Sequence, residues 1–257
     1  MGFSVLYSLR SLVRHRHTTW AASAGIGLLV FVLASSRMLA AGLESTMLRA
    51  GRSDRALVMQ LDAWSEAGSR VRGSAFELAA GAPGVRRDGS GIPLVAHESV
   101  AQVFLSRKNR PSEYTAIQVR GVHSTSFALR SYVRVVEGRA AKPGTTEAIV
   151  GRGVVGRYAG LGLGERFELQ KGRDFTVVGV FEADGTAYES EVWIDLEAMR
   201  SALGWQGSFS SVTAELESER ALPAFTAALT TDKLLGLSVA RESDYYDKVS
   251  NSMARLI

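Results

Sequence analysis

The longest apolar stretch of this chain constrains its fold most. Residues Trp20 to Leu43 read WAASAGIGLLVFVLASSRMLAAGL and contain a single charge, Arg37. About 20 helical residues are enough to cross the roughly 30 Å hydrocarbon core of a bilayer. An arginine at mid-bilayer costs about 3 kcal/mol, but near a helix end its stem reaches the headgroups. We therefore predict a transmembrane helix at residues 20–43, with Arg37 at its outer interface.

The segment before this stretch is basic and amphipathic. It carries Arg10, Arg14 and Arg16 and predicts a helix at the membrane interface over residues 1–19. A cleaved secretory signal is the alternative, but no clean small-residue cleavage site follows the apolar stretch. Arginines beyond the stretch nearly balance the charge before it, and long domains translocate largely regardless of charge. We predict a cytoplasmic N-terminus, an uncleaved anchor and a main domain outside the membrane.

The rest of the chain has the composition of an ordinary globular protein. Of its 257 residues, 46% are hydrophobic and 22% are charged, with a net charge of +4. About 200 residues remain outside the apolar stretch, enough for one substantial core or two small ones. The arginines are scattered and not interleaved with aromatic residues, which argues against a nucleic-acid groove. There is no cysteine, so disulfides and thiolate chemistry are excluded.

Two outer segments of this remainder share a strand, helix, strand pattern. In the first, we predict a strand, a helix capped by Ser69, and an extended stretch, at Ala56–Leu61, Ser69–Ala80 and Pro93–Leu105. In the second, we predict a half-buried strand with alternating residues, a helix and a short strand, at Ser211–Glu217, Arg220–Thr230 and Leu237–Ala240. A closing helix follows at Asp244–Ile257.

The middle of the chain is rich in strand signals separated by Gly, Asp and Pro. Strands are predicted at Ala116–Val122, Tyr132–Val136, Glu147–Val150, Arg166–Leu169, Phe175–Val180 and Glu191–Ile194. The fold class is therefore α+β: a membrane helix and stalk, then a platform of the βαβ type with an inserted, mainly β subdomain. The predicted boundaries are 1–19 for the interfacial helix, 20–43 for the span, 44–112 and 207–243 for the platform, 113–206 for the insertion, and 244–257 for a return helix.

Motifs that would indicate chemistry are weak. Gly151, Gly153 and Gly156 form a G-x-G-x-x-G, but only Val154–Ala159 can be helical before further glycines, so we predict a strand, a short helix and a turn. No phosphate-binding G-x-x-x-x-G-K-[ST] loop, H-E-x-x-H or G-x-S-x-G occurs, so any ATP-driven role needs a partner.

The candidate metal and acid–base residues also favour structural roles. His15 and His17 lie in the interfacial segment without further ligands, and His97 and His123 are interpreted as separate surface or strand residues. Four carboxylates gather around one turn, where a cation or an acid–base pair is the alternative to a solvated loop. They are Glu182, Asp184, Glu189 and Glu191.

Several blocks of the middle segment together resemble a known family. They are Val136-Glu137-Gly138-Arg139, Glu147–Gly151, Gly160-Leu161-Gly162-Leu163-Gly164-Glu165, Phe175–Phe181 and Glu191–Asp195. These blocks look like the periplasmic core domain of MacB/FtsX-type ABC transporter permeases, and Leu9–Arg16 resembles the basic helix before their first span. The family-motif residues are expected to be structural: Glu137, Gly138, Arg139, Gly151, Gly162, Gly164, Gly179 and Asp195.

The resemblance implies a permease subunit that is not itself an enzyme. In that family a dimer of permeases works with cytoplasmic ATPase subunits, and ATP-driven closure moves the periplasmic domains. The result is export, lipoprotein release or mechanical signalling across the envelope. The implied partners are an ABC ATPase that holds the ATP, a second permease copy, membrane lipid and a periplasmic or outer-membrane protein; this chain itself needs no cofactor, metal or nucleic acid. The implied location is the bacterial inner membrane.

The later spans expected of such a permease do not occur in these 257 residues. We therefore expect either a piece of a longer permease or a subunit without its own transport machinery. The alternative function is a single-span envelope protein that binds or scaffolds a partner and never meets an ATPase. A membrane-anchored hydrolase is disfavoured, because the histidines are scattered.

Overall fold

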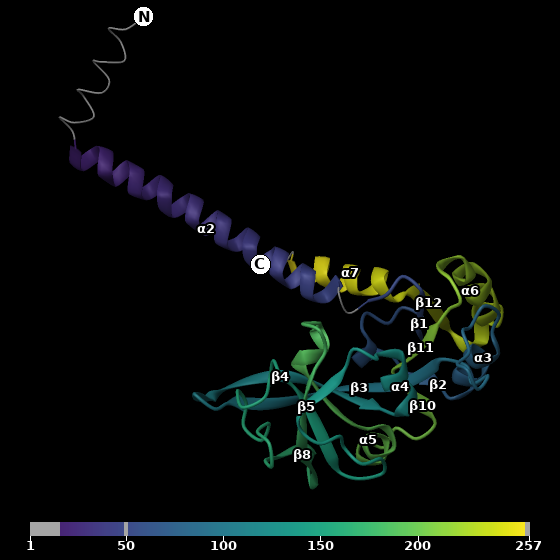
Figure 1. Ribbon diagram of the computed structural model, residues 1–257. Helices are drawn as coiled ribbons and strands as arrows, with labels where there is room; N and C mark the ends of the chain where they lie inside the picture. Colours follow the sequence, from purple (N-terminus) through teal and green to yellow (C-terminus); the bar gives the residue numbers. More distant parts are fainter. Residues whose placement is uncertain (1–15, 49–50, 255–257) are drawn as a thin grey trace, which may run out of the picture.

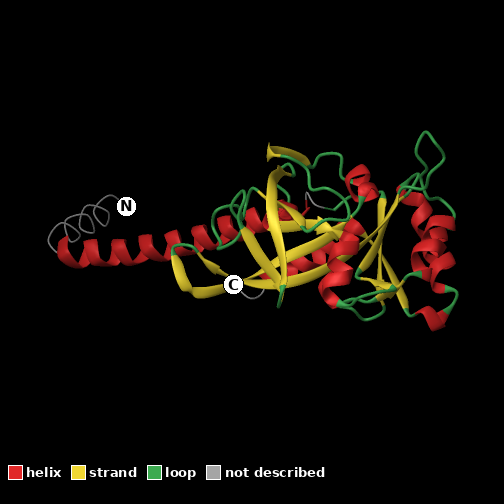
Figure 2. Ribbon diagram, turned by 90° about the horizontal axis from the view of Figure 1, so that it is seen from below, coloured by secondary structure: helices red, strands yellow, loops and turns green. Residues whose placement is uncertain are grey.

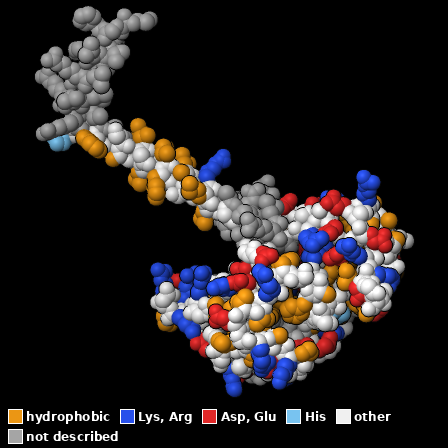
Figure 3. All heavy atoms as spheres, viewed as in Figure 1, with side chains coloured by type: hydrophobic (Ala, Val, Ile, Leu, Met, Phe, Trp, Pro, Cys, Tyr) orange, Lys and Arg blue, Asp and Glu red, His pale blue; other side chains and the backbone are white. Residues whose placement is uncertain are grey.

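The computed structural model describes residues 16–48 and 51–254. Its longest element is α2 (Arg16–Leu48), a rod of 33 residues that extends from the folded body (Figure 1). At a rise of 1.5 Å per residue it is about 50 Å long. Apolar side chains along it are exposed, for example Ile26 at 66% and Phe31 at 68%, and Figure 3 shows hydrophobic atoms along its visible face.

The predicted membrane span coincides with the middle of α2. Judged on length and hydropathy together, no helix among the described residues qualifies as a membrane span. The transmembrane assignment of residues 20–43 therefore stays a prediction. Arg10 and Arg14 lie outside the described residues, Arg16 is the first residue of α2, and Arg37 is exposed on it.

The body is built on one mixed sheet of ten strands. Its order is β12-β1-β11-β3-β4-β9-β6-β8-β5, and β7 pairs with β8 beside this path. A separate pair joins β10 to β2. The strands are β1 (Arg55–Gln60), β2 (Val71–Arg72), β3 (Val95–Arg107), β4 (Arg110–Val122), β5 (Arg134–Gly138), β6 (Glu147–Gly151), β7 (Arg166–Gln170), β8 (Arg173–Glu182), β9 (Glu191–Asp195), β10 (Ser208–Phe209), β11 (Ser211–Glu215) and β12 (Leu237–Arg241).

Short helices cover this sheet, as Figure 2 shows for the red elements at its right end. The α-helices are α3 (Ser74–Gly81), α4 (Ser124–Leu129), α5 (Leu196–Leu203), α6 (Leu222–Thr230) and α7 (Glu242–Ala254). The 3-10 helices are η1 (Glu66–Gly68), η2 (Ala187–Ser190), η3 (Glu219–Ala221) and η4 (Lys233–Leu235). Helix α7 contacts α2 and β1, so the last described helix lies beside the first (Figure 1).

Three apolar cores hold the body together. One packs β1 and β11 against α3 and α6, with Phe225 and Leu229 fully buried. A second lies between β4, β6, β8 and α5, around residues such as Val150 and Val177. The third lies on the opposite face, where Trp193 and Tyr188 pack near Tyr246 of α7. The long β3–β4 hairpin belongs to both halves of the sheet, because β3 pairs with β11 and β4 with β9.

Each predicted strand has a counterpart in the sheet, whereas β2 and β10 were not predicted, and most other errors concern helices. Ser69 does not cap a helix: it ends η1, and α3 begins later, at Ser74. Strand β11 is buried on both faces and not on one. Helices α4 and α5 were not predicted, and residues 154–159 form turns and not a short helix. The boundary predicted at residue 112 falls inside β4, and the division into subdomains stays a prediction.

Two glycines pair where β5 meets β8, because side chains would collide there. Gly138 has φ of +69°, and a Cβ atom on it would lie 2.3 Å from the carbonyl oxygen of Val178. A Cβ atom on Gly179 would lie 2.2 Å from the carbonyl oxygen of Arg139. Both obstacles are backbone atoms, which cannot swing away as a side chain can. Only glycine allows β5 to lie this close to β8.

We predict that Gly179→Val destabilises the protein by about 1–3 kcal/mol or more, because overpacking against backbone forces strands apart. Thermal unfolding of the full chain in detergent measures this. Gly89→Val is the matched control, since a Cβ atom there meets nothing within 4 Å. Equal melting temperatures for the two variants would contradict the close-approach argument.

Candidate functional site

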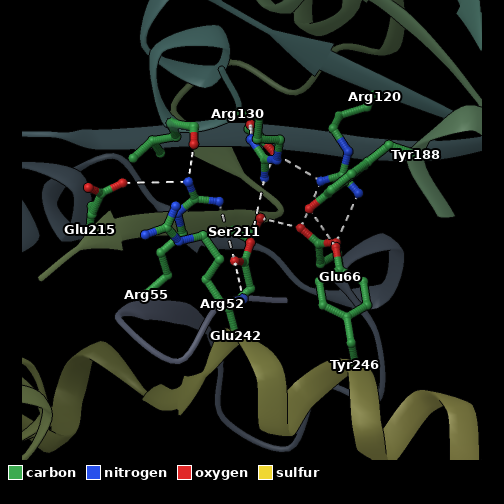
Figure 4. Close-up of polar contacts among 12 residues, drawn as sticks. Arg52, Arg55, Glu66, Arg120, Arg130, Tyr188, Ser211, Glu215, Glu242 and Tyr246 are labelled. Carbon is green, nitrogen blue, oxygen red and sulfur yellow. Dashed lines mark hydrogen bonds and ion pairs between the residues drawn. The ribbon is translucent and has the colours of Figure 1, made fainter. Parts of the chain in front are cut away.

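One arginine at the centre of the body contacts three glutamates. Arg120 comes from β4, Glu98 from β3, Glu191 from β9 and Glu66 from η1. Adjacent strands bring the first three together, and the η1 turn carries Glu66 across the sheet face. All four are buried, and the side chain of Arg120 is only 1% exposed. Four charges from four elements thus meet away from water, and Figure 4 shows the contact between two of them, Arg120 and Glu66.

The geometry uses the whole guanidinium group of Arg120. Its Nε and Nη2 donate to the two carboxylate oxygens of Glu191 at 2.8 and 2.9 Å. Its Nη1 and Nη2 donate to those of Glu66 at 2.9 and 3.0 Å, and Nη1 donates to Glu98 at 2.9 Å. Arginine carries five N–H donors in a planar fork. Five hydrogen bonds to three carboxylates therefore satisfy this group.

Neighbouring side chains donate further hydrogen bonds to the same carboxylates. Ser211 donates to Glu66 at 2.7 Å, and Trp193 donates to Glu191 at 2.8 Å. Glu98 accepts from both terminal nitrogens of Arg130, at 2.5 and 3.1 Å. The ring of Tyr188 lies beneath both arginines, 5.2 Å from Arg120 and 4.8 Å from Arg130. A buried ionic group is tolerated best when its hydrogen bonds are made. Every donor of Arg120 is used, whereas the buried Nε of Arg130 has no hydrogen-bond partner among the described residues.

A second part of the network reaches the two helices that leave the body. Arg55 of β1 donates to the carbonyl oxygen of Leu129 and contacts Glu215 at 3.5 Å. It also lies 3.6 Å from Glu242, the first residue of α7. Glu242 in turn accepts a hydrogen bond at 3.1 Å from the backbone N–H of Arg52, between α2 and β1. The charge network therefore joins the base of both helices to the sheet.

These contacts shift the ionisation of the buried groups. Burial alone would raise the pKa of Glu98, but Arg130 and Arg120 outweigh it and hold that pKa at about 2. For Glu242 burial dominates and raises the pKa, although Arg130 and Arg55 oppose the shift. Burial also raises the pKa values of Tyr188 and Tyr246, whose hydroxyl groups are hydrogen-bonded at 2.8 Å. Glu98 and Glu242 both contact Arg130, but the pKa of the first is lowered and that of the second is raised.

The arrangement is suited to holding elements together, not to chemistry on a substrate. Each carboxylate at its centre is directed at an arginine, and the arginine–carboxylate contacts occupy the groups that would bind a ligand. No group of three or more His, Asp or Glu side chains placed to hold a metal ion occurs in the described residues. Removing one partner of such a buried pair costs about 3–5 kcal/mol. The network therefore holds β3, β4, β9 and η1 together.

The residues predicted from the family blocks lie elsewhere, around β5, β6 and β8. Gly138 and Gly179 pair as described above, and Gly151 packs against the backbone of Glu189. Gly162 lies beside the carboxylate of Glu165, and Gly164 has φ of +81°. The structural role of these residues as a family motif stays a prediction.

The charged members of the same blocks have local roles. Arg139 forms a double hydrogen bond with Glu147 at 2.5 and 2.6 Å, and this contact lowers the pKa of Glu147 to about 2. Asp195 caps α5 by accepting from the N–H of Ala198 at 2.9 Å. Glu137 is exposed on β5. None of these charged residues belongs to the central network around Arg120.

The four carboxylates predicted to gather at one turn separate in the structure. Glu189 accepts from the N–H groups of Ala183 and Gly185 and so shapes the turn. Glu182 pairs with Arg152, and Asp184 pairs with Arg134 at 3.2 Å. Glu191 is different, because it is buried against Arg120. The solvated-loop interpretation holds for the first three and is wrong for Glu191.

The two histidines interpreted as separate are neighbours. His97 of β3 and His123, which caps α4, have ring centroids 4.6 Å apart. Phe76 and Phe209 pack on His97 at 4.3 and 4.1 Å. Burial lowers the pKa of His97 to about 4, helped by His123 and Arg200 and opposed by Glu98. Burial also lowers the pKa of His123. The pair is therefore neutral at pH 7.

The central network was missed by sequence reasoning, although a signal exists. Arg120 stands in the run Ile117-Gln118-Val119-Arg120-Gly121-Val122, and Glu98 stands in an equally apolar strand. A charge within a strand that is buried on both faces must find an opposite charge. That rule marks the residues but does not identify their partners.

We predict that Arg120→Met destabilises the protein by about 3–5 kcal/mol at pH 7, because three buried carboxylates lose their shared cation. The pKa of Glu98, which Arg130 and Arg120 hold low, should then rise, so the loss should shrink as the pH falls toward 5. Denaturant unfolding at both pH values measures this. Arg110→Met, which removes an exposed pair with Glu113, should cost about 0.5 kcal/mol or less. Equal effects of the two substitutions would refute the assignment.

We also predict that the free energy of unfolding falls as the pH falls from 6.5 to about 4. The unfolded His97 takes up a proton near pH 6.5 and the folded one only near pH 4, so acid favours the unfolded state. His97→Phe should flatten this part of the stability curve and leave the slope due to His123. An unchanged slope in urea unfolding experiments would show that the buried pair is already open to water.

One comparison with known proteins shows the family, and another shows the fold. The sequence profile described as the MacB-like periplasmic core domain matches residues 19–232. No curated protein sequence matches this chain significantly. Among solved structures, the periplasmic region of MacB from Actinobacillus actinomycetemcomitans has a TM-score of 0.52 at 12% identity, covering 80% of this chain and 95% of that one.

A second solved structure has the same fold. The extracellular domain of the noncanonic ABC-type transporter YknZ, from Gram-positive bacteria, has a TM-score of 0.50 at 16% identity, covering 72% of this chain and 99% of that one. These identities show the fold alone, whereas the profile match covers most of the chain. This chain belongs to the family of MacB-like periplasmic core domains.

Proposed function

We propose that this chain is part of a permease subunit of an ABC-type transporter in the bacterial inner membrane. Helix α2 would be its first membrane span, with the N-terminus in the cytoplasm and the body outside. Family membership supports the transporter assignment. The exposed apolar side chains along α2 support the anchor, because solvent-facing stretches of this kind normally have a partner or a bilayer around them.

One observation carries the proposal further: Glu242 fastens the outer ends of the two helices to the body. Its carboxylate accepts from the backbone of Arg52 at 3.1 Å and lies 3.6 Å from Arg55 and 4.0 Å from Arg130. The backbones also meet here, since a Cβ atom on Gly51 would lie 2.7 Å from Cα of Ser243. A movement of α2 against α7 would therefore act directly on the charge network.

On this basis the function is mechanical. A cytoplasmic ATPase subunit would hydrolyse ATP, the membrane helices of two permease copies would move, and the extracytoplasmic bodies would follow. Export, lipoprotein release and mechanical signalling to an envelope protein all fit this scheme. The chain would be no enzyme and would hold no cofactor, because the ATP would be bound by its partner. Lipid and a periplasmic or outer-membrane protein would complete the assembly.

The second candidate is a single-span envelope protein that binds or scaffolds a partner without an ATPase. The decisive experiment is purification of the native, full-length gene product from detergent-solubilised membranes, followed by mass spectrometry. Near-stoichiometric recovery of an ATPase with a phosphate-binding loop would support the permease. Its reproducible absence would favour the single-span protein.

We predict that Glu242→Ala weakens the coupling between the helices and the body. A spin label on Leu234→Cys, a 91% exposed position, reports the distance between the two copies of a dimer. The chain has no other cysteine, so the label is unique. The distance should change with nucleotide in the parent complex and change less in Glu242→Ala, with the ATPase still bound. Glu219→Ala, on the exposed surface, is the control. A full response in Glu242→Ala would contradict the mechanical role.

A further inference from the structure

The β3–β4 hairpin extends well beyond the rest of the sheet. Strand β11 pairs with β3 only up to Glu98, and β9 pairs with β4 only from Gln118 onward. Beyond these points the two strands are paired mainly with each other, from Val103–Ile117 to Arg107–Arg110. In both ribbon views the hairpin projects from the body toward the side on which the N-terminal end of α2 lies (Figures 1 and 2).

The two faces of this hairpin differ. Val103 and Ile117 are buried in the core of the body. On the opposite face, Phe104 is 66% exposed and Tyr114 is 69% exposed. Phe104 pairs with Ala116, and Ser106 pairs with Tyr114, so both rings lie on one face as diagonal neighbours. Two large aromatic side chains are thus presented outward near the end of a projecting hairpin.

The end of the hairpin is also basic. Arg107, Lys108 and Arg110 surround its turn, and Lys108 donates its backbone N–H to the carbonyl oxygen of Arg157 at 3.0 Å. A cavity of about 490 Å³ opens between these two segments. Its lining is Arg107, Lys108, Asn109, Gly156, Arg157 and Tyr158. Figure 3 shows Lys and Arg atoms gathered at this end of the body.

The positive charge exceeds the negative charge there. Lys108 pairs with Glu165 at 2.5 Å, and Arg110 pairs with Glu113 at 3.1 Å. Within the described part of the chain, Arg107 and Arg157 make no ion pair. The guanidinium of Arg107 lies 5.8 Å over the ring of Tyr158, at the edge of the cavity. Two guanidinium groups therefore remain for an anion from outside.

We propose that this tip docks on anionic phospholipid headgroups of the membrane that holds α2. Guanidinium groups bind phosphate oxygens in pairs, and exposed aromatic rings favour the level of the headgroups. Juxtamembrane basic residues are attracted to anionic lipid. A projecting aromatic and basic tip on the side of the anchor meets each of these requirements. The proposal rests on the membrane anchor of the proposed function.

The docking would give the body a second attachment to the membrane. Helix α2 is one point of support, and a headgroup contact at the hairpin tip is another. Two points fix the tilt of the body, whereas one leaves it free to swing. The hairpin strands carry Glu98 and Arg120 at their inner ends, so the second support ends in the central charge network.

The test uses fluorescence of the full chain in nanodiscs. Asn109→Cys, at the hairpin turn, carries an environment-sensitive dye, and lipids with a spin label on the headgroup act as quencher. We expect strong quenching in discs that contain phosphatidylglycerol, and several-fold weaker quenching in pure phosphatidylcholine or at high salt. Dye on Leu234→Cys, at η4, is the unquenched control.

Charge variants test the role of the two free arginines. Arg107→Gln together with Arg157→Gln should reduce quenching at position 109 several-fold in anionic discs. Arg72→Gln together with Arg220→Gln, which removes two exposed charges elsewhere, should not. Equal quenching in neutral and anionic discs, or no effect of the first pair, would overturn the headgroup assignment.

Dye on Gly27→Cys separates this proposal from the one on which it rests. Quenching of that dye by spin labels on the acyl chains, without quenching at position 109, would overturn the hairpin contact and leave the anchor intact. If neither the dye at position 27 nor the dye at position 109 were quenched, the membrane anchor itself would be overturned. A response of the dye at position 109 to inorganic phosphate in detergent, with none to lipid, would make the cavity a site for soluble anions and overturn the lipid assignment.

Discussion

The structure depends on the guanidinium group of one residue, Arg120. Its five hydrogen bonds to three glutamates connect β3, β4, β9 and η1, which come from distant parts of the chain. Buried charges cost more to bring out of water than an equally sized apolar cluster. Their geometry is specific, however, because all five N–H donors of Arg120 are directed at carboxylate oxygens. The β3–β4 hairpin joins the two halves of the sheet, and Arg120 lies on that hairpin.

The same network links helices α2 and α7 to the body. Glu242 begins α7, contacts the backbone that follows α2, and lies beside Arg55 and Arg130. Burial raises the pKa of Glu242, whereas Arg130 and Arg120 lower the pKa of Glu98 nearby. Arg130 contacts both carboxylates, one at the centre of the sheet and the other where α7 begins.

Much of the fold could be predicted from the sequence, and the central site could not. Strands such as β6 and β8 follow from alternating or continuously apolar residues between turns. Helices α4 and α5 were missed because they are short, although local signals exist: Asp195 caps α5, and Gly204 ends it in the left-handed conformation. The Arg120 network and the contact between His97 and His123 depend on residues brought together by the sheet order. Periodicity gives the direction of a side chain, but not which distant strand lies beside it.

The order of strands has a further consequence for how the chain is made. Strand β1 lies between β11 and β12, and its residue Ala56 pairs with Arg241. The first strand of the body to be synthesised therefore receives both neighbours only when the last strands have emerged. Until then its buried run of Ala56, Leu57, Val58 and Met59 has two unpaired edges. Such long-range pairing is slow and prone to aggregation, so we expect this protein to need a chaperone during biogenesis more than its modest size suggests.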